Sequence, residues 1–341
     1  MSNYQIFFLS IVLFVNFLFF YNLSRIAKTI NIFDFPDNNR KIHKGKIPVL
    51  GGLLIIFNII LIVLFLNKQI LNFEVYKNVI LINSYYFIFT FFFSLLFLFF
   101  IGIIDDKYSI KPFIKILSFF FIYFILVFFD ESLHIKYLKF SFLDFDISLR
   151  KSGILLAIIC LVFAVISQNM FDGANLQTGG LYLFICIFFI YNKIALDLFL
   201  IIFFSLLFFL YYNSKNKIFL GDSGVYVLSF LTSFYFIKSY NMNLGPKYLD
   251  EVFSYLFLPS VDCVRVGVQR VYFGKNPFMP DRTHFHHILL RKYSANSSCV
   301  VIILLLLTPF IWINFLQLSV ICLILLQFIS YFLFLYISRK K

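Results

Sequence analysis

The strongest constraint on this chain is a set of apolar runs too long for the core of a water-soluble domain. The run from Phe87 to Ile104 contains no charged residue. It is long enough to cross a bilayer as a helix, and it lacks the apolar–polar alternation of a membrane β-barrel. Only 13% of the residues are charged, against about 25% in soluble domains. The chain is predicted to be an all-α polytopic membrane protein.

Eleven segments qualify as candidate spans, and together they form a single integral membrane domain over 1–341. They are 4–23, 48–66, 79–104, 113–129, 153–168, 180–191, 196–212, 224–237, 252–268, 299–316 and 318–337. Between two of these spans, the alternating stretch that starts at His134 predicts a short β-hairpin near 134–149.

The basic residues predict the orientation of the spans. With the N-terminus outside and the C-terminus cytoplasmic, 20 of the 29 Lys and Arg residues fall on the inner side, as the positive-inside rule requires. The hairpin then lies at the outer face. The net charge of +13 suits anionic lipid headgroups or a polyanionic substrate. The basic residues are divided among short loops, so no face suited to nucleic acid is expected.

Half of the carboxylates fall at the inner membrane edge, in short polar motifs. Asp105 and Asp106 end a long apolar span, which indicates a metal or proton site or simply a solvated helix end. Asn169 and Asp172 are spaced to share one helical face and one cation, although Asp172 also precedes a glycine, as in a turn. Asp222 lies between Gly221 and Ser223–Gly224, a pattern that suits either phosphate contact or a turn.

The densest polar motif runs from Pro277 to His287. It places His284, His286 and His287 close to Arg282, a combination that favours contact with phosphate or uridine. A zinc site is less suited, because histidines at this spacing do not converge from a regular helix. A plain polar surface loop is the third interpretation.

A basic loop near the N-terminus adds three further candidates for substrate contact. Arg40, Lys41 and His43 precede Pro48 and Gly51–Gly52. The basic residues also suit lipid headgroups, while the proline and glycines indicate close packing at the start of a span.

Taken in order, these motifs resemble the polyprenyl-phosphate N-acetylhexosamine-1-phosphate transferase superfamily, glycosyltransferase family 4. The resemblance extends from about Asp34 to Leu290, and the His-x-His-His pattern is similar to the undecaprenyl-phosphate GlcNAc-1-phosphate transferase branch. It implies catalytic loops at 24–48, 105–112, 169–179, 213–223 and 269–298 on the cytoplasmic face of the inner (plasma) membrane. One departure follows Asn175, which occupies a position where the family usually has an Asp or Asn: the next family residue is a glycine, whereas Leu176 stands here.

The resemblance implies transfer of a sugar-1-phosphate from a UDP-sugar to a polyprenyl phosphate, with release of UMP. The cation would be Mg²⁺, with Mn²⁺ as an alternative, held by Asn169 and Asp222. Asp105, Asp106 and Asp172 would be catalytic. Substrate contact would come from the following residues: Arg40, Lys41, His43, Asn175, Arg282, His284, His286 and His287.

Three alternatives differ in activity from this interpretation. A muramoyl-pentapeptide phosphotransferase belongs to the same superfamily, but usually has three adjacent histidines. A proton-coupled secondary transporter would place its acids near the bilayer midplane. A CDP-alcohol-type transferase would carry another acidic motif after Asp172. The choice between direct attack and a covalent intermediate stays open, as does assembly into a homodimer.

Overall fold

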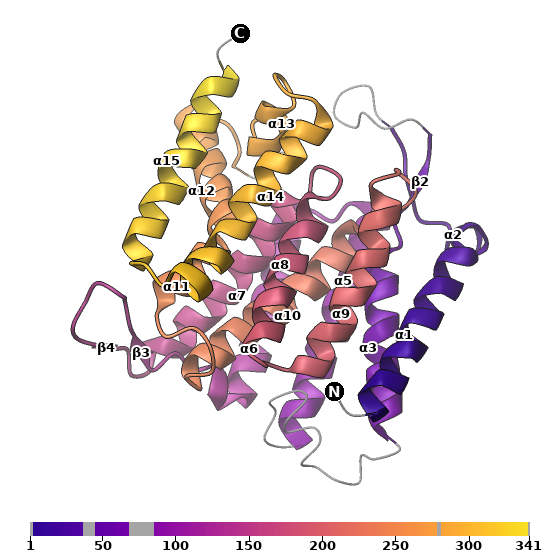
Figure 1. The fold of residues 1–341 in the computed structure, drawn as a ribbon, viewed down its shortest axis with the longest axis horizontal. Helices are drawn as coiled ribbons and strands as arrows, with labels where there is room; N and C mark the ends of the chain where they lie inside the picture. The colour runs from indigo at the N-terminus through magenta and orange to yellow at the C-terminus, as the bar shows by residue number, and fades with distance from the viewer. Residues whose placement is uncertain (1–2, 37–44, 68–84, 278–280, 340–341) are drawn as a thin grey trace. The chain divides into compact units, whose positions relative to one another are not determined.

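The computed structural model describes residues 3–36, 45–67, 85–277 and 281–339 (Figure 1). In this part of the chain nearly all regular structure is helical, because the apolar runs leave no other way to satisfy the backbone in lipid. The predicted Arg40, Lys41 and His43 lie outside the described residues.

The described residues divide into two compact units. The first comprises residues 1–111 and 185–228, and the second 112–184 and 229–341. Helices α8 (Gln177–Tyr191) and α10 (Gly221–Asn241) contribute residues to both.

The first unit otherwise contains five helices and one small sheet among the described residues. The helices are α1 (Asn3–Tyr21), α2 (Leu23–Ile30), α3 (Gly51–Asn67), α5 (Tyr85–Tyr108) and α9 (Leu196–Asn213). The antiparallel sheet pairs β1 (Phe33–Asp34) with β2 (Ile47–Pro48).

The second unit contains the remaining described elements. They are α6 (Pro112–Phe129), the 3₁₀ turn η1 (Glu131–Leu133), β3 (Tyr137–Leu138), β4 (Ile147–Ser148), α7 (Ser152–Phe171), α11 (Leu249–Tyr255), α12 (Phe257–Tyr272), α13 (Phe285–Leu289), α14 (Ala295–Ile311), the π-helical turn η2 (Trp312–Leu316) and α15 (Val320–Arg339).

Six helices within the described ranges are long and apolar enough to cross a membrane, which confirms an α-helical multi-pass protein. They cover Phe87–Tyr108, Pro112–Phe129, Ser152–Phe171, Leu196–Asn213, Ser297–Leu316 and Val320–Ser338. A seventh would be the pair Leu9–Tyr21 and Leu23–Ile30, which is bent by 67°. By length and composition, the described helices therefore do not reach the predicted count of eleven spans.

The shortfall has a physical cause in the helices that fail these criteria. Two apolar helices, α3 with 17 residues and α8 with 15, are shorter than the about 20 residues of a usual span. The window predicted at 224–237 falls on α10, which is rich in serine and tyrosine, and the window at 252–268 is divided between α11 and the 16-residue α12.

In the first unit, α1, α3 and α9 pack against one another. Side-chain amides of Asn16 and Asn58 form two reciprocal hydrogen bonds of 3.0 and 3.1 Å between α1 and α3. Phe20 stacks on Tyr212 of α9 with ring centroids 4.2 Å apart. The rings fill the interface while the amides fix which residues face each other.

In the second unit, α7 packs against both α6 and α12, and α13 packs against α15. The predicted hairpin is present, since Tyr137 pairs with Ser148 and Leu138 with Ile147. A buried ion pair of 3.3 Å between Lys238 and Asp130 lies in the same unit.

Candidate functional site

The predicted acids of the first unit gather where two distant segments run side by side. Phe219 N–H donates to the Pro48 carbonyl at 3.0 Å, and Gly51 and Gly52 N–H donate to the Phe219 and Leu220 carbonyls at 3.0 and 3.1 Å. These backbone bonds attach the start of α3 to the start of α10. Pro48 and the paired glycines at the start of α3 therefore serve close packing, as the sequence predicted.

Three glycines allow this approach. A Cβ on Gly51 would lie 2.7 Å from the Leu220 Cα, and one on Gly102 of α5 would overlap the backbone of Ser223. Gly221 has a φ of +76°, which other residues rarely adopt. The helices α3, α5 and α10 can meet at this corner only because side chains are absent from it.

Asp106 joins the end of α5 to the start of α10. Its Oδ1 accepts the Asp222 N–H at 2.7 Å and its Oδ2 accepts the Ser223 N–H at 3.1 Å. The first amides of a helix have no partner within the helix, and they carry partial positive charge. Asp106 is therefore a capping carboxylate supplied by another helix.

The Asp105 carboxylate has other partners than that of Asp106, and the residue is almost fully buried. Its Oδ1 accepts the Ile110 N–H at 2.8 Å, and its Oδ2 accepts the Tyr226 hydroxyl at 2.5 Å. The two adjacent carboxylates thus fix both the end of α5 and the first two turns of α10. Asp222, half-buried in the first turn of α10, is placed by these contacts.

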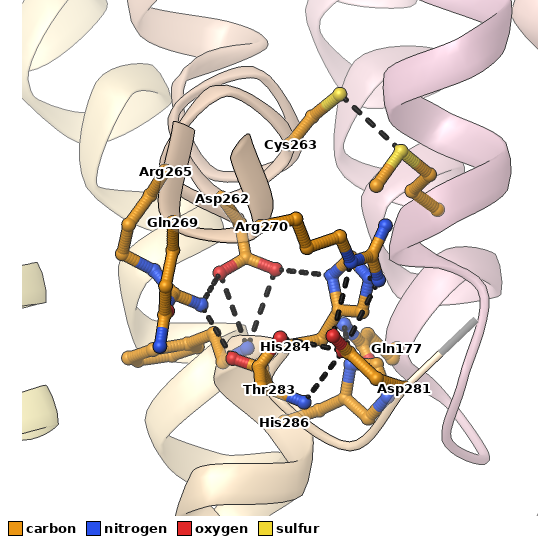
Figure 2. A network of polar contacts seen from close by, with 12 residues as sticks. Gln177, Asp262, Cys263, Arg265, Gln269, Arg270, Asp281, Thr283, His284 and His286 are labelled. Atoms are coloured by element: carbon orange, nitrogen blue, oxygen red, sulfur yellow. Dashed lines mark hydrogen bonds and ion pairs between the residues drawn. The ribbon is translucent and has the colours of Figure 1, made fainter. Parts of the chain in front are cut away.

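A second polar cluster, in the second unit, is organised around Asp262 of α12 (Figure 2). Its Oδ2 lies 2.8 Å from His284 Nδ1, and its Oδ1 accepts Arg265 Nη2 at 2.7 Å and the Tyr331 hydroxyl at 2.6 Å. The Phe285 N–H also points at both oxygens, at 3.1 and 3.2 Å. One buried carboxylate therefore connects α12, α15 and the beginning of α13.

Arg270, about two helical turns beyond Asp262 on α12, holds the loop before α13. Its Nε and Nη2 donate to the two oxygens of Asp281 at 3.0 and 3.1 Å, and its Nη1 donates to the Pro277 carbonyl at 2.6 Å. Burial opposes ionisation of Asp281, but hydrogen bonds from Arg270 and Thr283 outweigh it and hold the pKa well below its usual range. Both ends of the loop are fixed by α12.

The three predicted histidines are brought together, although in different surroundings. His284 and His286 are buried with their rings stacked 5.9 Å apart, and the His286 and His287 ring centroids are 4.2 Å apart. His286 Nδ1 lies 3.4 Å from Gln177 Nε2, and its Nε2 packs against Gly173. Burial, helped by the neighbouring imidazoles, lowers the pKa of His286 to about 3, so the ring is neutral. Arg282, by contrast, is exposed to solvent.

The remaining predicted residues lie on the connection from α7 to α8, in the second unit. Asn169 is in the last turn of α7, and its carbonyl accepts the Asp172 N–H at 3.2 Å. Asp172 itself is exposed, while Asn175 is half-buried. Leu176 has a φ of +65°, so the residue that departs from the family pattern occupies a conformation that suits glycine.

Several residues of these clusters were not singled out from the sequence. Asp262, Arg265, Arg270 and Tyr331 lie on helices whose other residues are mostly apolar, and Gln177 begins α8. The available signal was the occurrence of Asp262 and Arg265 within one predicted span, with Arg270 two positions after its end, since charges inside spans are costly and need partners.

Comparison with known proteins supports the resemblance that the motifs suggested. The family model for glycosyl transferase family 4 matches residues 88–240. Relatives named undecaprenyl-phosphate alpha-N-acetylglucosaminyl 1-phosphate transferase occur in Yersinia pestis and Escherichia coli K12. They are 25% and 24% identical over 84% and 87% of this chain, covering 77% and 79% of their own lengths. A Pasteurella multocida relative of the same name is 27% identical over 82% of this chain and 76% of its own. The family model and the named relatives agree, and they confirm the predicted resemblance of this chain to glycosyl transferase family 4.

Proposed function

We propose that this protein transfers N-acetylglucosamine-1-phosphate, or a closely related N-acetylhexosamine phosphate, from a UDP-sugar to undecaprenyl phosphate. The observation that carries the proposal is that relatives of this one activity align with more than four fifths of the chain. The alignments extend well beyond the acidic corner and include most of the loops that bear the motifs. A secondary transporter is not favoured by these relatives.

The reaction is a phosphoryl transfer between two phosphate compounds. An oxygen of the lipid phosphate attacks the phosphorus atom that carries the sugar, a new P–O–P linkage forms, and the bond to UMP breaks. Little proton transfer is needed, because the attacking phosphate is already anionic. The protein must instead orient two anions and offset their charge.

Asp222 is the residue best placed to act on the diphosphate. Asp106 and the glycine contacts of the corner fix its backbone at the first turn of α10. Asp105 and Asp106 thereby hold Asp222 in place. Their part in orienting the lipid phosphate stays a prediction.

The donor chemistry of this corner suits Mg²⁺. Its side-chain donors are carboxylate oxygens, which hard cations prefer, and Mg²⁺ usually keeps water and substrate phosphates among its ligands. No cage of three acidic, histidine or cysteine side chains is present among the described residues, and such a cage is not needed for this mode of binding. Asp222 would supply a ligand from this corner, while the part of Asn169 in the second unit stays a prediction. When bound, Mg²⁺ offsets charge on the diphosphate.

The loop before α13 is proposed to contact the UDP-sugar. Arg282 is exposed beside a rigidly held backbone, since its carbonyl accepts Arg291 Nη2 at 3.0 Å and the next residue, Thr283, bonds to Asp281. A guanidinium in this position can bind phosphate with two hydrogen bonds. His287, at the edge of the cluster, is half-buried, whereas His284 and His286 are buried.

The main test is a transfer assay on purified protein in nanodiscs. The reaction contains undecaprenyl phosphate, Mg²⁺ and one UDP-sugar at a time, including UDP-N-acetylmuramoyl-pentapeptide, and UMP is measured. We expect UMP release with UDP-GlcNAc or another UDP-N-acetylhexosamine, and at least about a hundredfold loss in Asp222→Asn. Release with the muramoyl substrate alone, or with none, contradicts the proposal.

The cytoplasmic placement of the site requires a separate test. We propose eleven spans in the plasma (inner) membrane, with the N-terminus outside and the C-terminus inside, because the basic residues are so distributed. A reporter inserted near Asn296 should then be cytoplasmic. A reporter signal from the outer side at that point contradicts the orientation.

A further inference from the structure

The second polar cluster includes one histidine whose two ring nitrogens are both directed at protein groups. His284 Nδ1 lies 2.8 Å from Asp262 Oδ2, and His284 Nε2 lies 3.4 Å from Arg270 Nη2. The ring is buried, with 7% of the residue exposed. His284 is thus enclosed between an acid and a guanidinium (Figure 2).

These two partners permit only one protonation state of the ring. Arg270 is always protonated and has donors but no acceptor, so His284 Nε2 must face it with a lone pair. Asp262 already accepts bonds from Arg265, Tyr331 and the Phe285 amide, and an ionised carboxylate requires a donor at Nδ1. The only arrangement that satisfies both ends is a neutral imidazole with its proton on Nδ1.

The contacts of Arg270 extend to the exposed part of the loop before α13. Arg270 also holds Asp281 with two hydrogen bonds, and Asp281 in turn accepts the Thr283 N–H at 2.9 Å. Arg282 lies between these two anchored residues. The direction of its side chain therefore depends on a connected series of contacts that begins at Asp262.

We infer that Asp262 and Arg270 are positioning residues that hold His284 as the Nδ1–H tautomer. Together with His284 they thereby fix the loop that presents Arg282. His284 does not itself grip a phosphate, because neither ring nitrogen is left to do so. The part of this inference that concerns catalysis rests on the proposed function, while the tautomer does not.

The tautomer can be measured without turnover. The chain has five histidines, so protein labelled with ¹⁵N-histidine in nanodiscs gives a small set of ring signals by magic-angle-spinning NMR. His284→Gln identifies the signals of interest. We expect a protonated Nδ1 and an unprotonated Nε2 for His284 near neutral pH. A protonated Nε2, in either the other tautomer or the cation, would overturn the inference.

Asp262→Asn changes the partner while keeping its shape. An amide turned with its NH₂ toward His284 forces the proton to Nε2, where it meets Arg270, and the opposite turn leaves the NH₂ facing Arg265. We expect the His284 signals to change and the KM for the UDP-sugar to rise at least tenfold, on the order of 1.4 kcal/mol in binding. The KM for undecaprenyl phosphate should stay the same.

Tyr331→Phe is the matched control. It removes one of the bonds to Asp262 but keeps the ring that stacks on Phe285 at 4.9 Å. We expect it to retain the wild-type His284 signals and a UDP-sugar KM within about threefold of wild type. A UDP-sugar KM that is unchanged in Asp262→Asn, or a Tyr331→Phe protein with the same loss as Asp262→Asn, contradicts the positioning role.

A second route covers failure of Asp262→Asn to fold. Arg270→Gln removes the guanidinium from Nε2 and from Asp281, and we expect mixed His284 tautomers and a raised UDP-sugar KM. A wild-type protein that transfers no sugar but shows the Nδ1–H tautomer refutes the proposed function alone. Active wild-type protein with the other tautomer refutes the inference alone.

Discussion

Asp106→Asn tests whether a carboxylate from α5 controls the start of α10. In the wild type, one oxygen accepts the Asp222 N–H at 2.7 Å and the other accepts the Ser223 N–H at 3.1 Å. Asparagine can accept only one of these, because its NH₂ group would face the second amide. The substitution also removes a negative charge from a helix N-terminus.

The expected loss of stability follows from three overlapping terms. A hydrogen bond to a charged group contributes about 1.5–3 kcal/mol, an N-cap about 0.5–2 kcal/mol, and a charge at a partly buried helix end up to about 2 kcal/mol. Because the terms describe the same contacts, they do not add, and we expect a loss of roughly 2–4 kcal/mol. Asp222 should then lose its fixed position, so transfer activity should fall at least tenfold.

The assay is thermal unfolding in nanodiscs together with UMP release. Asp144→Asn is the matched control, since it removes a carboxylate from an exposed position of the hairpin segment and should change neither quantity. Asp222→Asn should lose activity with little change in the thermal midpoint. If Asp106→Asn keeps the wild-type midpoint and activity, Asp106 does not control the start of α10.

Three further perturbations test other features. Gly102→Ala should lower the unfolding free energy by about 1–3 kcal/mol, because the new methyl group meets the backbone of Ser223, whereas Gly267→Ala, with open space around it, should be neutral or stabilising; equal thermal midpoints would contradict this. Leu176→Gly should stabilise by up to about 1 kcal/mol by relieving a left-handed backbone, and a lower midpoint would show that the leucine side chain contributes more than its strain costs. The pKa of His286 near 3 is below that of an unfolded histidine, so the unfolded chain binds more protons as pH falls. Stability should drop by about 2 kcal/mol between neutral pH and about pH 5, and His286→Gln should flatten this dependence of the thermal midpoint.

The sequence predicted the acidic corner but could not reveal how it is built. Asp105, Asp106 and Asp222 were identified from their positions at span ends, and the structure places them at one corner of the first unit. The direction of the Asp106 carboxylate depends on the close approach of α5 and α10 at Gly102. That approach is a property of packing between segments more than a hundred residues apart in sequence, which periodicity does not report.

The histidine loop shows a different limit. Its residues were recognised because they are consecutive, and the structure confirms that they form one cluster. Asp262 is not part of the motif, because it lies 22 positions before His284 on a helix with many apolar residues. The assignment of roles within the cluster also required the structure, since only the partners of each ring nitrogen distinguish His284 from His287.

The Asn16–Asn58 pair has a consequence for the order of membrane assembly. Each amide also donates to the carbonyl four residues earlier in its own helix, Asn16 to Val12 at 2.7 Å and Asn58 to Leu54 at 2.8 Å. When either helix inserts alone, one amide hydrogen of its asparagine is therefore already bonded within the helix, and only the second awaits the partner helix. Lateral association can follow insertion, and the exchange of two interhelical bonds, about 0.6–2 kcal/mol each, then selects one rotation of α1 about its axis. Insertion and recognition are thus separable steps at this helix pair.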